Sequence, residues 1–347
     1  MMSSPLNAKA PASTKLRTRP LVATIILFGG IAALILSLAL SISVGAADIS
    51  LSTVWEAVFH FNADEIQHQI IKELRMPRAL AAALVGAAFA VAGSVMQGMT
   101  RNPLADSSLL GINAGAGFML ALCFAFFPSV SYLALMFICF AGAALSMGLV
   151  YGIGSLAKGG LTPVRLTLAG AAVGALLLAI TEGIALYFKI GQDLAFWYAG
   201  GVAGTKWVQI QIISPWVIGG LLGAIALSRS ITLLSLGDDV AAGLGQRTGW
   251  VKAGGVIIVL LLAGTAVSAV GSIGFVGLII PHISRFLVGV DYRWIIPCSA
   301  VLGSLLMVLA DIGGRLVNPP QEVAIGIIIA VLGVPFFLYL VTRMKGE

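Results

Sequence analysis

Long runs of apolar residues recur along almost the whole chain, and they constrain its fold more than any other feature. A helix that crosses a lipid bilayer needs about 20 consecutive apolar residues. The sequence therefore predicts an all-α integral membrane protein with about ten transmembrane helices in a compact bundle. The ten expected spans are 21–44, 79–100, 108–127, 131–156, 164–189, 209–229, 251–271, 275–289, 294–315 and 323–342.

The composition excludes a soluble globular protein. Of 347 residues, 59% are hydrophobic and only 10% are charged, and the mean hydropathy is +1.04. Soluble domains are about 45–50% apolar and about 25% charged. Ten spans of about 20 residues leave room for tails and connections but not for a fused ATPase domain. We expect a cytoplasmic N-terminal tail, 1–20, followed by one transmembrane domain over 21–347.

The basic residues orient the bundle. Most of the 20 lysines and arginines fall in the segments that share a side with the two termini, so the positive-inside rule predicts cytoplasmic termini. These residues stand singly between apolar runs, which does not favour a nucleic-acid partner despite the net charge of +6. Five spans per half is an odd number, so a repeat between the halves would be an inverted one, as is common in transporters.

The sequence contains no recognisable catalytic or metal-binding pattern. The histidines are His60, His68 and His282, and no HExxH or GxSxG motif occurs. The three cysteines form no CxxC pair and lie within apolar stretches. The glycine-rich segment 200–206 lacks the Gly-Lys-Ser/Thr order of a phosphate-binding loop. We therefore expect a protein that is not an enzyme, with no cofactor and no metal site, and with any ATP hydrolysis residing in another chain.

Charged groups within the expected spans are sparse. Glu182 and Asp311 lie near the outer ends of their spans, and Asp311 precedes Arg315 by four residues, a spacing that allows an ion pair within one helix. Ion-coupled carriers usually place several ionisable groups near the middle of the membrane. This distribution favours a pathway driven from outside the chain, with an ion-coupled secondary transporter as the alternative from another class.

The segment Arg75–Arg78, with the sequence RMPR, stands at the expected outer mouth of the second span. Pro77 suits the first turn of a helix. Positive charge at a helix N-terminus opposes the helix dipole, so the two arginines indicate a missing acidic partner. That partner can belong to another protein, or the charges can be met locally by Glu73 or lipid headgroups.

A cytoplasmic segment at about 236–246 has the pattern of a short amphipathic helix. Its start and stop signals are acidic residues and glycines, namely Asp238, Asp239, Gly243 and Gly245. Apolar side chains recur every four residues along it, at Leu236, Val240 and Leu244. Such a helix either anchors the chain at the membrane surface or docks a cytosolic partner.

Several of these segments together resemble the FecCD family, the permease subunits of binding-protein-dependent ABC importers for iron-siderophores, haem and cobalamin. The resemblance runs from about residue 50 to the C-terminus. One departure is Ala324, where the family typically has proline. The matching segments are 75–78 (RMPR), 93–111 (GSVMQGMTRNPLADSSLLG), 271–285 (GSIGFVGLIIPHISR), 310–315 (ADIGGR), 322–326 (EVAIG) and 333–335 (GVP).

The resemblance implies roles for particular residues. Docking of a binding protein on the outer face is implied for Arg75, Arg78 and Arg315. Coupling to an ATPase is implied for Leu236, Gly237, Asp238, Ala241 and Gly245. A cytoplasmic gate is implied for Asn102 and Leu104. His282 belongs to the family's Pro-His pair, and we interpret it as packing at a helix end rather than as a ligand.

The resemblance also implies the function and the partners. The chain would be a multi-pass permease subunit of a bacterial cell-membrane ABC importer, forming the pathway for an iron-siderophore complex. An extracytoplasmic binding protein would deliver the complex, and two cytosolic ABC ATPase subunits would drive transport. A second permease subunit, identical or homologous, would complete the pathway within the lipid membrane. Import of haem or cobalamin is the alternative within the same family.

Overall fold

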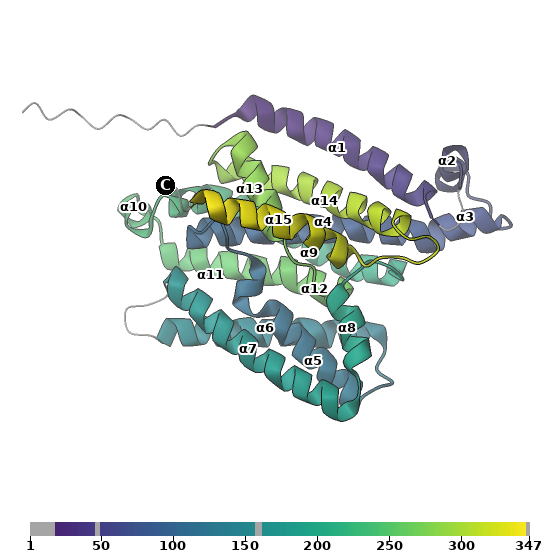
Figure 1. Ribbon diagram of the computed structural model, residues 1–347. Coiled ribbons are helices and arrows are strands. Elements are labelled where there is room, and N and C mark those ends of the chain that lie inside the picture. Colours follow the sequence, from purple (N-terminus) through teal and green to yellow (C-terminus); the bar gives the residue numbers. More distant parts are fainter. Residues whose placement is uncertain (1–17, 46–48, 157–161, 345–347) are drawn as a thin grey trace, which may run out of the picture.

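The computed structural model describes residues 18–45, 49–156 and 162–344, and these residues form helices joined by short connections (Figure 1). Each of the ten predicted spans coincides with a helical segment. The segments are α1 (Pro20–Ser43), α4 (Met76–Thr100), α5 (Ile112–Phe126), α6 (Tyr132–Leu156), α7 (Pro163–Phe188), α9 (Trp207–Ser235), α11 (Thr248–Val259) continued through η3 (Leu260–Gly264) into α12 (Thr265–Val270), α13 (Val276–Val288), α14 (Tyr292–Leu316) and α15 (Ile325–Met344). The expectation of an all-α membrane bundle is confirmed.

Two of the predicted spans are shorter than a membrane crossing. Within the described residues, eight helices are long and apolar enough to cross a bilayer, and α5 and α13 are shorter apolar helices. Helix α5 begins only after Gly111, whose φ is 72°, whereas Gly271, at 81°, ends α12 before the chain reaches α13. Such backbone conformations suit glycine and end or delay a helix. The apolar residues before these helices are therefore in turns and extended chain.

Three short helices lie in segments that the sequence analysis treats as connections. They are α2 (Leu51–Phe59), α3 (Ile66–Ile70) and α8 (Gly191–Ala199). Helix α3 runs through a π-helical turn, η1 (Ile71–Arg75), directly into α4, so that one continuous helix extends over 66–100. Pro77 does lie in the first turn of α4, as predicted, but no free helix N-terminus exists there.

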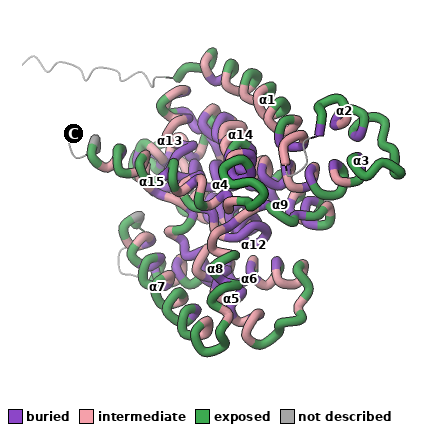
Figure 2. Tube along the Cα trace, turned by 45° about the vertical axis from the view of Figure 1, so that its right-hand side comes forward, coloured by how far each residue is buried: buried purple, intermediate pink, exposed green. Residues whose placement is uncertain are grey.

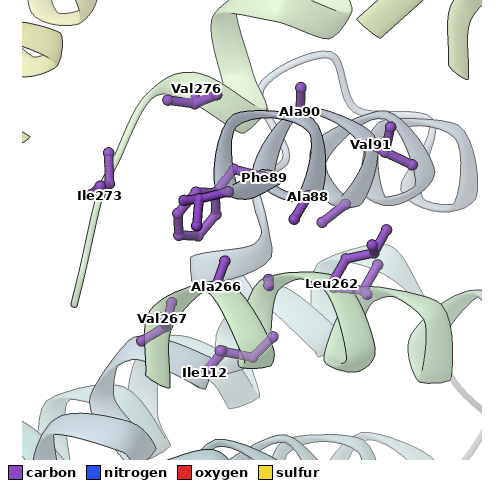
Figure 3. Packing of buried hydrophobic residues seen from close by; sticks show 14 of the residues in the cluster. Ala88, Phe89, Ala90, Val91, Ile112, Leu262, Ala266, Val267, Ile273 and Val276 are labelled. Atoms are coloured by element: carbon purple, nitrogen blue, oxygen red, sulfur yellow. The ribbon is translucent and has the colours of Figure 1, made fainter. Parts of the chain in front are cut away.

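Helix α4 forms the centre of the bundle. In its most apolar stretch 83% of the residues are buried, against 6% for α1, which lies at the periphery (Figure 2). Side chains of α4, among them Phe89, lie beside Leu262 of η3 and beside Ala266 and Val267 of α12 (Figure 3). The core is thus built around a helix that the apolar pattern alone does not distinguish from its neighbours.

Close helix contacts around α4 depend on glycine. A side chain at Gly86 would collide with the backbone of Gly303 on α14, and one at Gly93 with the backbone of Gly277 on α13. Small residues allow such approach between membrane helices. Of the small-residue spacings visible in the sequence, Gly115 and Gly170 make backbone contacts of this kind. Open space surrounds three other glycines with this spacing, Gly148, Gly152 and Gly219.

The ends of the bundle carry the polar groups that matter for function. We call the end where Arg78 lies the arginine end, and the end where the short helix α10 (Asp238–Gly243) lies the α10 end. Helix α4 connects them, since it begins beside Arg75 and ends beside Arg101. The inverted relation of two five-helix halves and the single domain over 21–347 stay predictions, and most of the expected tail 1–20 lies outside the described residues.

Candidate functional site

A cluster of charged side chains from three segments lies at the arginine end. Arg78 of α4 donates from Nε and Nη2 to Asp311 Oδ1 of α14, at 3.0 and 2.9 Å. Its Nη1 reaches Glu322, just before α15, at 2.8 Å. The side chain of Asp311 is fully buried, whereas that of Arg78 is 16% exposed. For Arg78 of the RMPR motif, acidic partners thus lie within this chain, at Asp311 and Glu322.

Asp311 also binds a second arginine. Arg315 Nη2 lies 2.8 Å from Asp311 Oδ2, which confirms the ion pair expected from their spacing of four residues. One buried carboxylate therefore serves two guanidinium groups. Burying charge requires this kind of pairing, because an unpaired ion away from water is costly.

Arg75 and Arg315 have a second structural role at the end of α1. Arg75 Nη1 donates to the carbonyl oxygens of Ile42 and Ser43, both at 2.7 Å. Arg315 donates to the carbonyl oxygen of Ser41 at 2.8 Å and to its hydroxyl at 2.6 Å. The last carbonyls of a helix lack partners within the helix and carry its negative dipole end. The two arginines thus cap α1, and both are largely buried.

Two adjoining cavities open beside this cluster. One of about 630 Å³ is lined by Arg78, Asp311 and Glu322 together with α8 and the start of α15. A second, of about 680 Å³, continues between α8 and α15 past Tyr198 and Phe275. The two share lining residues of α8 and α15. Together they form a groove that starts at a charged mouth and becomes mainly apolar. Helix α8, which forms one wall of this groove, is not predicted from the sequence.

The residues predicted to form a gate lie in the turn after α4. Asn102 Oδ1 accepts a hydrogen bond from the amide of Leu104 at 2.9 Å, and the amide of Ala105 donates to the Asn102 carbonyl at 3.1 Å. Leu104 packs against an apolar cluster that contains Leu278 of α13 and Leu340 of α15. The turn therefore packs a leucine against two helices at the end of α4 that lies near α10.

The predicted amphipathic segment at 236–246 contains a helix, but a shorter one. Helix α10 covers only Asp238–Gly243, because Gly237 and Gly245 adopt positive φ values of 130° and 81°. Leu236, Val240 and Leu244 are exposed, so the segment has the apolar face that its pattern predicts. Ala241 is buried.

Asp238 does not point away from the bundle. Its carboxylate lies 2.9 Å from Lys252 Nζ of α11 and 3.5 Å from Arg101 Nη2 at the end of α4. The start of α10 is therefore held by ion pairs within the chain.

His282 packs against α15. Its ring meets the edge of Phe336 with the ring centres 5.9 Å apart. Among the described residues, no group of three or more histidine, cysteine or acidic side chains is placed to hold a metal ion.

The comparison with known families matches this arrangement. Residues 33–343 match the model of the FecCD transport family. The chain belongs to the FecCD family. It is therefore a multi-pass membrane permease, a transport subunit of an ABC importer rather than an enzyme. This confirms the resemblance on which the residue roles were predicted.

Characterised relatives cover most of both chains. The iron(3+)-hydroxamate import system permease protein FhuB of Bacillus subtilis (strain 168) is 55% identical over 323 residues, which are 93% of this chain and 84% of that protein. The hemin transport system permease protein HmuU of Yersinia pestis is 33% identical, covering 93% of this chain and 97% of that protein.

A solved structure has the same fold. It is described as an inward-facing conformation of a metal-chelate type ABC transporter, and it superimposes with a TM-score of 0.81. The match covers 92% of this chain and 99% of that one, at 29% identity.

Proposed function

We propose that this chain forms the membrane pathway of an importer for iron-siderophore complexes, with ferric hydroxamates as the ligand class. The observation that carries the ligand class is the 55% identity to the iron(3+)-hydroxamate permease FhuB. The groove at the arginine end supports it, because cavities of about 630 and 680 Å³ fall within the range of about 300–1,000 Å³ typical of small-molecule sites.

The groove has walls from one chain only. Helices α8 and α15 line it, and the other side is open in the single subunit. A second permease subunit, identical or homologous, completes the pathway in our proposal. The mainly apolar wall beyond the charged mouth suits passage of a ligand rather than tight binding.

The arginine end faces the outside and receives the binding protein. Arg78 is the residue best placed for this, because its side chain is partly exposed at the cavity mouth while its charge is already balanced by Asp311 and Glu322. Arg75 and Arg315 are predicted docking residues as well. Their contacts with the end of α1 supply a rigid base beneath the docking surface.

The α10 end faces the cytoplasm, together with both termini, and meets one of two ATPase subunits. The contact surface in this proposal centres on the exposed apolar face of the coupling segment. Gly237 and Gly245 shape that segment through their positive φ values, and Ala241 and Asp238 fasten it to the bundle. The surrounding membrane lipid covers the peripheral helices, of which α1 is the least buried.

Asn102 and Leu104 close the pathway at the cytoplasmic side. The turn at Asn102 holds Leu104 against α13 and α15, and α15 also lines the groove. Opening then requires Leu104 to leave its apolar contacts. A movement of the ATPase subunits, transmitted through α10, supplies the free energy that separates Leu104 from these contacts.

Import of haem is the second candidate, favoured by the 33% identity to HmuU over nearly the whole chain. Cobalamin, the other cargo implied by the family resemblance, belongs to the same test. Ligand selection rests largely on the binding protein, which is a separate chain.

The deciding experiment measures uptake of radiolabelled ferric hydroxamate, ferric catecholate, haem and cobalamin in cells that carry or lack this gene. We expect loss of ferric hydroxamate uptake alone, restored by the wild-type gene. Loss of haem or cobalamin uptake with normal siderophore uptake would keep the family and change the cargo. Uptake that persists without ATP but needs a proton gradient would favour an ion-coupled carrier instead.

A further inference from the structure

The gate turn and the coupling segment meet at one ion pair. Arg101, the residue directly before Asn102, lies with Nη2 3.5 Å from Asp238 Oδ2 at the start of α10. Both side chains are partly exposed, at 43% and 37%. Gly237 lies close by, because a methyl group added there would sit 3.6 Å from Arg101 Nη1.

The backbone at Arg101 is unusual. Its φ of 52° and ψ of 29° place it in the left-handed region, which few residues other than glycine adopt. This conformation ends α4 and turns the chain directly into the hydrogen-bonded turn at Asn102. A residue in such a conformation, at a site of expected movement, is a reasonable origin for a functional hypothesis.

The contacts continue from this pair to the gate without a gap. Asp238 binds Arg101, the next residue Asn102 fixes the amide of Leu104, and Leu104 packs on the cluster formed by α13 and α15. On its other side Asp238 is held by Lys252 of α11, at 2.9 Å. One carboxylate thus connects the coupling segment both to the gate turn and to the bundle.

We propose that Arg101 is a positioning residue that lets the coupling segment hold the gate turn in place. The inference rests on the proposed function, since it assigns a partner to the gate. A partly exposed ion pair is weak, so a movement of α10 can break it in every transport cycle. Lys252 belongs to the bundle rather than to the gate turn, so its pair with Asp238 anchors α10 without affecting Leu104.

The test uses the complete importer with its binding protein in proteoliposomes. Hydrogen–deuterium exchange of the peptide that contains Leu104 and Ala105 reports on the turn directly, without reference to cargo. Arg101→Gln and Asp238→Asn should each raise exchange there by about two- to fivefold, the range of an exposed ion pair. The double variant should show no further rise. Arg229→Gln, at an exposed cation of α9 that takes no part in this contact, is the control and should leave exchange in this peptide unchanged.

A second measurement, the amount of ferric hydroxamate taken up per ATP hydrolysed, should fall in Arg101→Gln by a similar factor and stay unchanged in Arg229→Gln. Additive exchange effects of Arg101→Gln and Asp238→Asn, or no effect on exchange, would overturn the proposal even if uptake is normal in the wild type. Absence of ferric hydroxamate uptake by the wild type would overturn the proposed function instead, and the exchange result would still stand.

An independent observation concerns the surface of α2. Its inner face, Val54 and Ala57, packs on an apolar cluster that includes Ile71 and the end of α1. Its remaining apolar side chains are exposed to 59%, 62%, 43% and 60%, and they are Leu51, Trp55, Val58 and Phe59. These follow one another at intervals of four, three and one residues, so they share one stripe of the helix.

The place of α2 identifies what covers this stripe. Helix α1 is the least buried of the long helices, and its exposed side chains include Leu36 and Leu40, 71% and 44% exposed, just before it ends at Ser43. Helix α2 begins at Leu51, beside the end of α1 (Figure 1). The exposed stripe therefore belongs to a helix packed at the end of α1, whose own apolar side chains are exposed, and tryptophan is enriched at such helix ends, at the membrane interface.

We infer that α2 lies in the lipid interface and inserts Trp55 and Phe59 into the membrane. Nitroxide labels on single cysteines test this in proteoliposomes of the full chain, because the three native cysteines are buried. Labels at Trp55→Cys and Phe59→Cys should collide more with oxygen than with a water-soluble nickel chelate. Labels at the neighbouring Ser52→Cys and Glu56→Cys should do the reverse. Equal accessibility to the nickel chelate at all four positions would overturn the inference, as would protection of Trp55→Cys only when the binding protein is added.

Discussion

Helix α4 has arginines at both ends, and at each end a carboxylate from another helix pairs with them. The two ends differ in how deeply that carboxylate is buried. At the arginine end, Asp311 is fully buried and binds Arg78 and Arg315 at 2.9 and 2.8 Å. At the α10 end, Asp238 is 37% exposed and binds Lys252 at 2.9 Å and Arg101 at 3.5 Å. One carboxylate serves two cations in both places. Only the burial differs.

That difference in burial separates a fixed contact from one that can be broken. Removing one partner of a buried ion pair costs about 3–5 kcal/mol, because a charge is left unpaired away from water. An exposed pair contributes about 0.2–1 kcal/mol. The arginine end is therefore suited to holding α1, α4 and α14 together while a binding protein docks. The α10 end is suited to movement.

The largest effect is expected for Asp311→Asn. The variant leaves Arg78 and Arg315 close together without their shared carboxylate, so the free energy of unfolding should fall by about 3–5 kcal/mol. Thermal denaturation of the purified chain in detergent measures this. Asp239→Asn, which changes an exposed carboxylate on α10, is the matched control and should have a stability within about 0.5 kcal/mol of the wild type. Equal stability of the two variants would remove the contrast between the ends.

A smaller effect, confined to assembly, is expected for Gly237→Val. The φ of 130° at Gly237 is not accessible to a β-branched residue without strain of about 1–3 kcal/mol. The start of α10 should shift, and the amount of ATPase subunit that co-purifies should fall about tenfold, the equivalent of about 1.4 kcal/mol. Gly243→Ala tests whether any added side chain has this effect, because open space surrounds Gly243. Loss of ATPase in both variants would mean that backbone strain at Gly237 is not the cause.

Arg78→Gln should have a lesser effect at the other end. Asp311 keeps Arg315 as a partner, so the fold should remain while affinity for the binding protein drops about three- to tenfold, in the range of a partly exposed charge contact. Surface plasmon resonance with the immobilised importer measures this affinity. Lys189→Gln, a second exposed cation, serves as the control. Unchanged affinity in Arg78→Gln would assign Arg78 a purely structural role.

The sequence predicts the bundle well because span length and hydropathy are local properties. The ten helices lie where the apolar runs predict, and the Asp311–Arg315 pair follows from a spacing of four residues. The α10 segment is also local, although its flanking glycines shorten it.

The contacts of the arginines could not be predicted in the same way. Arg75 and Arg315 cap α1 across 33 and 274 residues, and Arg78 meets Glu322 across 244. The pattern of residues along the sequence does not indicate which distant carbonyl or carboxylate lies beside a given guanidinium. Helix α8 was not predicted for a related reason, since a periodic pattern cannot be identified over only nine residues. Long-range packing decides both.

The smallest effect is expected for Asp291→Asn. This variant tests whether an ion pair is fixed by its burial or by the end of the bundle at which it lies. Asp291 lies between α13 and α14, toward the end of the bundle that holds α10, yet it is only 4% exposed. It accepts hydrogen bonds from the Arg293 amide at 3.0 Å and from its guanidinium at 2.6 Å. Burial raises the pKa of this carboxyl, but the bonds from Arg293 outweigh it and hold the pKa below the ordinary value of 3.8.

A lowered pKa in the folded state means that Asp291 stabilises the fold above its unfolded pKa, and that this contribution disappears as the pH falls through the folded value. Wild-type stability should therefore drop more steeply than that of Asp291→Asn between about pH 5 and pH 3. The asparagine retains the ability to cap α14, so the two proteins should differ little near pH 7 beyond the loss of the Arg293 pair. Denaturation midpoints across this range provide the measurement. If the stability of Asp291→Asn fell with pH as steeply as that of the wild type, burial would not be the property that distinguishes fixed from breakable ion pairs in this permease.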